Sequence, residues 1–176
     1  MGLAEYLTVL RGCGSDARRK ARILTMSRWG TGVLNEDQVA AVTKSPVIGT
    51  IGYDRAAPPL LRDTNPESPL ANDYRRLCAN LPVDPDQPNR SVVITSSVEG
   101  EGATIAAINI SCTLADGGRS VLLIDADLRR PTVADHLGLE QTVGLTTVIV
   151  GLATLAEVVQ PVGRIKLVHA QVCPPR

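Results

Sequence analysis

The chain has 176 residues, 44% of them apolar, which is enough for one globular domain with a hydrophobic core. Its 18 basic and 18 acidic residues balance, so no global field attracts nucleic acid or an anionic membrane, and we expect no nucleic-acid binding. Only the segment 11–28 is locally basic. No window reaches the roughly 20 apolar residues of a membrane-spanning helix, so the chain is expected to have no span of its own.

Metal and disulfide sites are not expected. The four cysteines, at positions 13, 78, 112 and 173, have neither paired nor metal-type spacing, which is typical of reduced cytosolic thiols. His136 and His169 lack carboxylate or cysteine companions at ligand spacing, so neither is predicted to bind a metal. With no Phe and one Trp, the core must be built from aliphatic residues, a composition that suits a parallel sheet covered by helices.

Residues 1–34 are predicted to form a flexible, basic N-terminal arm. The pattern of residues 2–10 favours a short amphipathic turn of helix, and the glycines of residues 11–15 interrupt it.

Residues 35–90 are predicted to be a second segment with helices and a linker. Asn35 can cap a helix over residues 35–42, and residues 46–51 form a short strand that ends at a turn. The proline-rich residues 54–69 indicate an irregular loop.

A helix with clear end signals closes this segment. Ser68 is a typical N-cap, and Pro69 occupies the first helical position, where its missing N–H costs nothing. The helix is expected to continue to about Leu81 and to end before Pro82, with a linker over residues 82–89.

Residues 91–176 are predicted to form a partial nucleotide-binding domain. The β-branched run 91–95 indicates a strand, residues 96–104 a glycine-bearing loop, and residues 105–114 a helix. In this order, backbone N–H groups at the loop and helix N-terminus converge on one concavity that can hold a phosphate.

The loop matches a P-loop except for its lysine. In the frame G-x-x-x-x-G-K-[ST], Gly102 and Thr104 stand at the expected positions, Ser97 replaces the first glycine, and Ala103 replaces the lysine. The charge that clamps the β- and γ-phosphates is therefore missing. The candidate phosphate-binding residues are Ser97, Gly100, Glu101, Gly102, Ala103 and Thr104.

Two carboxylates follow the next strand. The apolar run 121–124 leads directly into Asp125 and Asp127, at the edge of a parallel sheet where ligands bind. A helix over residues 154–159 and a strand over 165–169 follow. This alternation predicts an α/β, P-loop NTPase-like, three-layer fold with a parallel sheet.

Together these motifs resemble the cytoplasmic ATP-binding domain of bacterial tyrosine kinases, the autokinases associated with capsule and exopolysaccharide export. The resemblance covers roughly residues 39–175. It includes Ser45–Gly49 with Tyr53–Arg55, Ser68–Pro69 with Tyr74–Arg75 and Asn80–Leu81, and the loop Thr95–Gly102. Its most specific part is Val121–Pro131, which is similar to the acidic Walker A′ motif of the family. Residues 1–11 resemble the stretch that precedes the first membrane helix of full-length members.

The resemblance implies particular roles for these residues. ATP or ADP and Mg²⁺ would be the cofactors, Thr104 and Asp125 would bind the magnesium, and Asp125 and Asp127 would be the catalytic Walker A′ carboxylates.

Four departures from the family pattern weaken the expected activity. Ala103 replaces the lysine, and the chain is expected to be truncated before the family's Walker B strand. No tyrosine-rich tail follows Tyr74, the last tyrosine of the chain. The oligomerisation motif E-x-x-R-x-x-R appears as Asn72, Arg75 and Cys78.

We therefore expect a degenerate, truncated relative of the protein-tyrosine autokinases, with weak nucleotide binding and little or no phosphoryl transfer. One alternative is an active ATP-dependent kinase domain that a partner chain completes. A third is a ParA/MinD-type ATPase, although Val98 stands where those proteins carry a signature lysine.

The expected partner is a membrane-embedded polysaccharide export or chain-length protein. The expected location is the cytoplasm, with peripheral attachment to the inner face of the cell membrane as an alternative. The missing strand would leave an apolar sheet edge, which predicts marginal stability or self-association.

Overall fold

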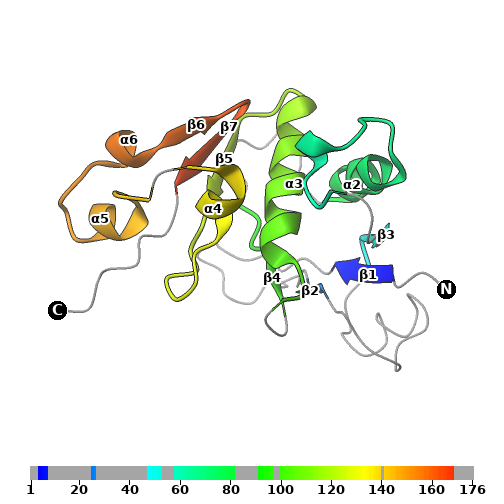
Figure 1. Cartoon of the computed structure of the whole chain (residues 1–176), viewed down its shortest axis with the longest axis horizontal. Coiled ribbons are helices and arrows are strands. Elements are labelled where there is room, and N and C mark those ends of the chain that lie inside the picture. Colours follow the sequence, from blue (N-terminus) through cyan, green and yellow to red (C-terminus); the bar gives the residue numbers. More distant parts are fainter. Residues whose placement is uncertain are drawn as a thin grey trace, which may run out of the picture. The chain divides into compact units, whose positions relative to one another are not determined.

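Figure 1 shows the computed structural model of the chain, which describes residues 4–7, 25–26, 47–52, 58–81, 91–96, 100–139 and 141–168. The chain divides into two compact units, Met1–Ala106 and Ala107–Arg176, each described by itself. Two predicted segments lie outside the described residues, the helix 35–42 and the linker 82–89. The domain boundaries predicted at residues 34 and 90 lie outside the described residues or next to them, and they also stay predictions.

Helix α2, Pro69–Asn80, begins and ends as the sequence predicts. The Ser68 hydroxyl oxygen accepts a hydrogen bond from the Ala71 N–H at 3.2 Å, so it satisfies one of the donors that a helix N-terminus leaves open. Pro69 occupies the first turn, and Leu81 forms the C-cap. The expected irregular loop before the helix is confirmed over its described part, where it contains only the 3₁₀ turn η1, Leu61–Asp63.

The core of the first unit lies between α2 and strand β3, Gly49–Gly52. The α2 side chains Ala71, Tyr74 and Leu77 are buried, as is Ile51 of the strand. Two side chains of α2 also bond the strand segment. Asp73 Oδ2 accepts from the Gly52 N–H at 2.9 Å, and Asn80 Nδ2 donates to the Ile48 carbonyl at 2.9 Å.

Gly49 lets β3 approach α2 closely, which gives a testable prediction. A Cβ at this position would lie 2.7 Å from Leu77 Cδ1 and 3.3 Å from Leu77 Cα. Because Leu77 is fully buried, it has no free space to move into. We expect Gly49→Ala to lower the free energy of unfolding by about 1–3 kcal/mol, measured by urea denaturation.

The matched control for that substitution is Gly117→Ala. A Cβ there would meet only the Leu114 and Thr113 carbonyl oxygens, at 3.4 and 3.5 Å, an ordinary contact. Equal losses in the two variants would contradict the close packing of β3 on α2.

Two strands near the N-terminus differ from the prediction. Residues Ala4–Leu7 form strand β1, which pairs antiparallel with β3, so the helical turn predicted over residues 2–10 is wrong. Strand β2, Thr25–Met26, pairs in parallel with β4, Thr95–Ser96. Strand β4 is shorter than the strand predicted over residues 91–95 and ends one residue later.

The second unit is built on a three-stranded sheet in the order β5-β7-β6. Strands β5, Val121–Ile124, and β7, Ile165–Val168, lie parallel, as expected for this fold. Strand β6, Gln160–Val162, is an antiparallel addition that the sequence did not indicate. Helices and a parallel strand pair alternate along the chain, so the prediction of an α/β fold is confirmed.

Between residues 100 and 168, the described residues form four helices, of which the first crosses the boundary between the two units (Figure 1). The predicted helix 105–114 is confirmed as α3, Ala103–Asp116, and the predicted helix 154–159 as α6, Leu155–Val158. Two short helices, α4 at Val133–Leu137 and α5 at Leu145–Ile149, were not predicted. Among the described residues no helix has the length and apolarity needed to cross a membrane.

Candidate functional site

Asp125 lies directly after β5 and holds the following loop in place. The residue is buried, with 6% of its surface exposed, and its carboxylate accepts three backbone hydrogen bonds. Oδ1 accepts from the Asp127 N–H at 3.1 Å, and Oδ2 accepts from the N–H groups of Thr132 and Val133 at 3.2 Å each. The last two donors stand at the start of α4, so Asp125 closes the loop onto the N-terminus of that helix.

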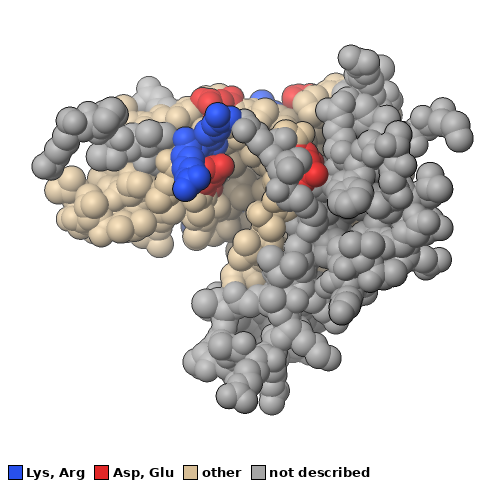
Figure 2. All heavy atoms as spheres, turned by 90° about the horizontal axis from the view of Figure 1, so that it is seen from below, with Lys and Arg blue, Asp and Glu red and all other residues tan. Residues whose placement is uncertain are grey.

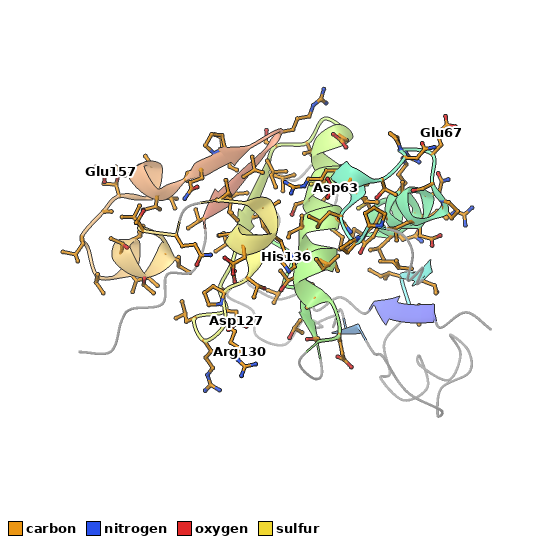
Figure 3. The ribbon with its side chains drawn as sticks, viewed as in Figure 1. Asp63, Glu67, Asp127, Arg130, His136 and Glu157 are labelled. Carbon is orange, nitrogen blue, oxygen red and sulfur yellow. The ribbon has the colours of Figure 1, made fainter. Side chains whose placement is uncertain are left out.

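Asp127 differs from Asp125 because it is exposed to solvent. Its Oδ1 accepts from the backbone N–H groups of Arg129 and Arg130, each at 3.0 Å. The N–H of Arg130, followed by that of Arg129, holds the pKa of the Asp127 carboxyl below its ordinary value. Figure 3 shows Asp127 and Arg130 on the loop between β5 and α4, and Figure 2 shows basic atoms beside acidic atoms on the surface.

The two carboxylates predicted from the sequence therefore lie on one loop with different surroundings. The prediction did not include the backbone donors of Thr132 and Val133. Thr132 could have indicated these donors, because threonine favours helix N-termini, where backbone N–H groups lack a partner within the helix.

The lowered pKa of Asp127 predicts a pH dependence. The carboxylate stabilises the folded state at pH values above 3.8, its ordinary pKa, and this contribution disappears as the pH falls through the lower pKa of the folded state. Because the group is exposed, we expect Asp127→Asn to cost less than about 1 kcal/mol at neutral pH. Melting temperatures of the two proteins, measured between neutral and acid pH, should converge at the acid end. Asp116→Asn, at the end of α3, is the control for removal of one exposed charge.

The glycine turn before α3 has the backbone conformation that its glycines allow. Gly100 and Gly102 both have φ of 84°, in the left-handed region, and α3 begins at Ala103. The Gly102 carbonyl accepts from the Ala106 N–H at 2.9 Å, so the glycine is joined to the first helical turn. Glu101 is buried at 4% exposure, Thr104 is half-buried, and Ser97 lies outside the described residues.

These residues fit a tight magnesium–nucleotide site poorly. Ala103 brings no charge to the helix start, and three N–H groups already occupy Asp125. In the described ranges, no three His, Cys, Asp or Glu side chains form a group that could hold a metal ion. The glycine turn and the Asp125 loop belong to different units, and each is described by itself.

The three positions of the degenerate oligomerisation motif lie on α2. Asn72 Oδ1 accepts from Arg75 Nη1 at 2.7 Å, and Arg75 Nη2 donates to the Pro66 carbonyl. The one arginine that is kept is therefore bonded within its own segment. Burial raises the pKa of the Cys78 thiol to about 12, which keeps it protonated at neutral pH.

The sequence of the chain is similar to tyrosine-protein kinases and to a transport protein of polysaccharide biosynthesis. No protein-family model matches the chain. It is 42% identical over 98 residues to the tyrosine-protein kinase YwqD of Bacillus subtilis (strain 168), an alignment that covers 55% of this chain and 41% of YwqD. It is 33% identical over 92 residues to the succinoglycan biosynthesis transport protein ExoP of Rhizobium meliloti (strain 1021), covering 51% of this chain and 12% of ExoP. The chain thus spans less than half the length of these relatives.

Solved structures agree with the sequence relatives. The chimerical protein CapA2B2 is 25% identical, with a TM-score of 0.70 over 80% of this chain and 62% of that structure. The kinase domain of the Escherichia coli tyrosine kinase ETK is 26% identical, with a TM-score of 0.59 over 69% of this chain and 49% of that domain.

Proposed function

Since the chain belongs to the bacterial tyrosine kinase family, we propose that it is a degenerate member of that family, which binds Mg·ATP or Mg·ADP weakly and transfers little or no phosphate. The observation that carries this proposal is Ala103, the first residue of α3 directly after the glycine turn, where the P-loop frame requires lysine. Catalysis of phosphoryl transfer depends almost entirely on positioned charge. Removal of one such charge is expected to raise the activation free energy of the transfer by about 3 kcal/mol, which lowers the rate on the order of a hundredfold.

Weak binding remains physically reasonable. A phosphate can still be attracted by the backbone N–H groups at the start of α3 and by the positive end of the helix dipole. Residues 97–104 are the proposed phosphate-binding residues there. In this proposal Thr104 lies in the first turn of the helix that attracts the phosphate, and Asp127 supplies a solvent-facing carboxylate. Asp127 suits that role because it is ionised and exposed, whereas Asp125 mainly orders the loop.

The biological role that we propose is modulation of a membrane-embedded protein of capsule or exopolysaccharide export, from the cytoplasmic face of the membrane. The resemblance to ExoP, a transport protein for succinoglycan biosynthesis, supports this setting. A chain without its own catalytic charge would act through contact with that partner.

An autophosphorylation assay tests the catalytic part of the proposal. Purified chain is incubated with labelled Mg·ATP, and phosphotyrosine is measured by mass spectrometry at Tyr6, Tyr53 and Tyr74. We expect no incorporation above that of Asp127→Asn. Incorporation by the unmodified chain that disappears in Asp127→Asn would overturn the proposal and favour an active kinase. Calorimetric titration with Mg·ADP tests the binding part, with a dissociation constant expected in the range of about 0.1–1 mM.

A further inference from the structure

The sheet of the second unit buries one face and exposes the other. Its strands β5, β7 and β6 lie side by side (Figure 1). The buried side chains of one face are Leu123, Ile165 and Leu167. Leu122 and Ile124, which alternate with Leu123 along β5, are 44% and 49% exposed. Since helices ordinarily cover both faces of parallel strands, the exposed face is of the kind that a helix covers.

A lysine lies in the middle of this exposed face. In the register of the sheet, Lys166 of β7 pairs with Leu122 of β5 on one side and with Pro161 of β6 on the other, and all three residues are exposed. Ile124 continues the row along β5. Val168, which pairs with Ile124, is buried, so the exposed area ends there. We call Leu122, Ile124, Pro161 and Lys166 the open sheet face.

The charges around the open sheet face are all positive. Arg119 precedes β5 and Arg164 precedes β7, so both exposed arginines stand at the same end of two parallel strands. Residues 117–124 and 158–168 contain these two arginines, Lys166 and no acidic residue. Within the described part of the chain, none of the three cations forms an ion pair. A partner with carboxylates opposite Lys166 therefore gains an attraction that an uncharged partner lacks.

We propose that the open sheet face binds an acidic amphipathic helix of a partner protein. The apolar side of that helix packs on Leu122, Ile124 and Pro161. Its Asp or Glu side chains, beside the apolar side, pair with Lys166 and Arg164. The proposal goes beyond the function proposed above, because it concerns the sheet and not the nucleotide site.

Other occupants fit the open sheet face less well. A second copy of the chain, bound through the same face in a two-fold dimer, would place Lys166 near the same cations of the first copy, which repel it. An anionic membrane is typically recognised by clusters of about four to eight Lys or Arg, and this face has three such residues around it. The charges therefore favour an acidic protein helix.

Fluorescence anisotropy with a labelled synthetic peptide tests the proposal. The peptide has about 20 residues, long enough to form a helix, and consists of Leu along one side, Glu beside them and Ala elsewhere. A second peptide has Lys in place of every Glu. We expect the glutamate peptide to bind the chain with a dissociation constant on the order of 10–100 µM, and the lysine peptide to bind roughly tenfold more weakly or worse.

Two substitutions separate the charge of the open sheet face from its apolar part. Lys166→Glu should weaken binding of the glutamate peptide roughly tenfold or more and should strengthen binding of the lysine peptide, because the charge at the centre of the face is reversed. Leu122→Ser should weaken binding of both peptides several-fold. Circular dichroism checks that each variant is folded.

Matched controls carry the same changes elsewhere on the chain. Arg76→Glu reverses an exposed cation of α2, in the other unit, and Leu152→Ser removes an apolar side chain that is 80% exposed between α5 and α6. Both variants should bind the glutamate peptide as the wild type does. No nucleotide is present in these titrations, so their failure leaves the proposed nucleotide binding untouched.

Several outcomes would overturn the proposal. They are no binding of the glutamate peptide up to about 1 mM, equal binding of the two peptides, and a loss of binding in Leu152→Ser that Leu122→Ser does not show. Cosedimentation with vesicles of equal parts phosphatidylcholine and phosphatidylglycerol identifies a membrane surface instead, if Lys166→Glu removes it and neither peptide binds. A dimer in sedimentation velocity that Leu122→Ser removes would assign the face to a second copy.

Discussion

Ala103→Lys is expected to raise the affinity of the chain for Mg·ADP by roughly ten- to hundredfold, because a hydrogen bond to a charged group contributes about 1.5–3 kcal/mol. Ala103 begins α3 directly after Gly102, so a lysine there would stand at the position of the P-loop clamp. A ligand that binds only the folded state raises the melting temperature. The thermal shift produced by Mg·ADP should therefore be larger in the variant than in the wild type, and calorimetric titration gives the affinity itself.

Ala103→Met is the matched control, since methionine has a long side chain without a charge. It should bind Mg·ADP as weakly as the wild type does. Without nucleotide, the lysine variant should melt slightly below the methionine variant, because a cation near a helix N-terminus is unfavourable by about 0.3–1 kcal/mol. If Lys and Met have equal effects on affinity, the missing charge is not what limits binding.

Elements with strong local signals were predictable from the sequence. Ser68 and Pro69 mark the start of α2 because a side-chain cap and a missing N–H act within one turn. The apolar run Val121–Ile124 predicted β5 correctly, although only Leu123 of its four residues is buried and β5 lies at an edge of the described sheet.

The missed elements depend on contacts that a local pattern does not contain. Helices α4 and α5 have five residues each, too few for a helical period to be recognised. Strand β6 contains Pro161, which is usually unfavourable in a sheet, but β6 is an edge strand and tolerates it. Residues Ala4–Leu7 form a strand by pairing with β3, which lies more than forty residues away in the sequence. A local pattern does not contain that pairing, so the prediction of a helical turn there was wrong.

For the candidate site, the sequence located the residues but did not separate their roles. Asp125 and Asp127 look equivalent as a pair that follows a strand. The structure distinguishes them, because one is buried under three N–H donors and the other is exposed. The donors Thr132 and Val133 lie seven and eight residues further on, beyond the range of a local motif.

Asp125→Ala is expected to lower the free energy of unfolding by about 3 kcal/mol or more, because it leaves the N–H groups of Asp127, Thr132 and Val133 without their acceptor. The Val133 hydrogen bond is buried, so water cannot easily replace the lost oxygen. For a chain of this length such a loss corresponds to a fall of about 6–12 °C in the melting temperature. Urea unfolding followed by circular dichroism would measure the free energy directly.

Two matched variants separate the hydrogen bonds of Asp125 from its charge. Asp125→Asn keeps the shape and one acceptor oxygen, but its NH₂ group must face a backbone donor, so we expect an intermediate loss of about 2 kcal/mol. Asp127→Ala, on the same loop, should cost less than about 1 kcal/mol because its partners are exposed. Comparable losses for Asp125→Ala and Asp127→Ala would contradict a structural role specific to Asp125. The predicted order Ala, Asn and Asp at position 125, from least to most stable, follows from the number of backbone donors that each side chain can satisfy.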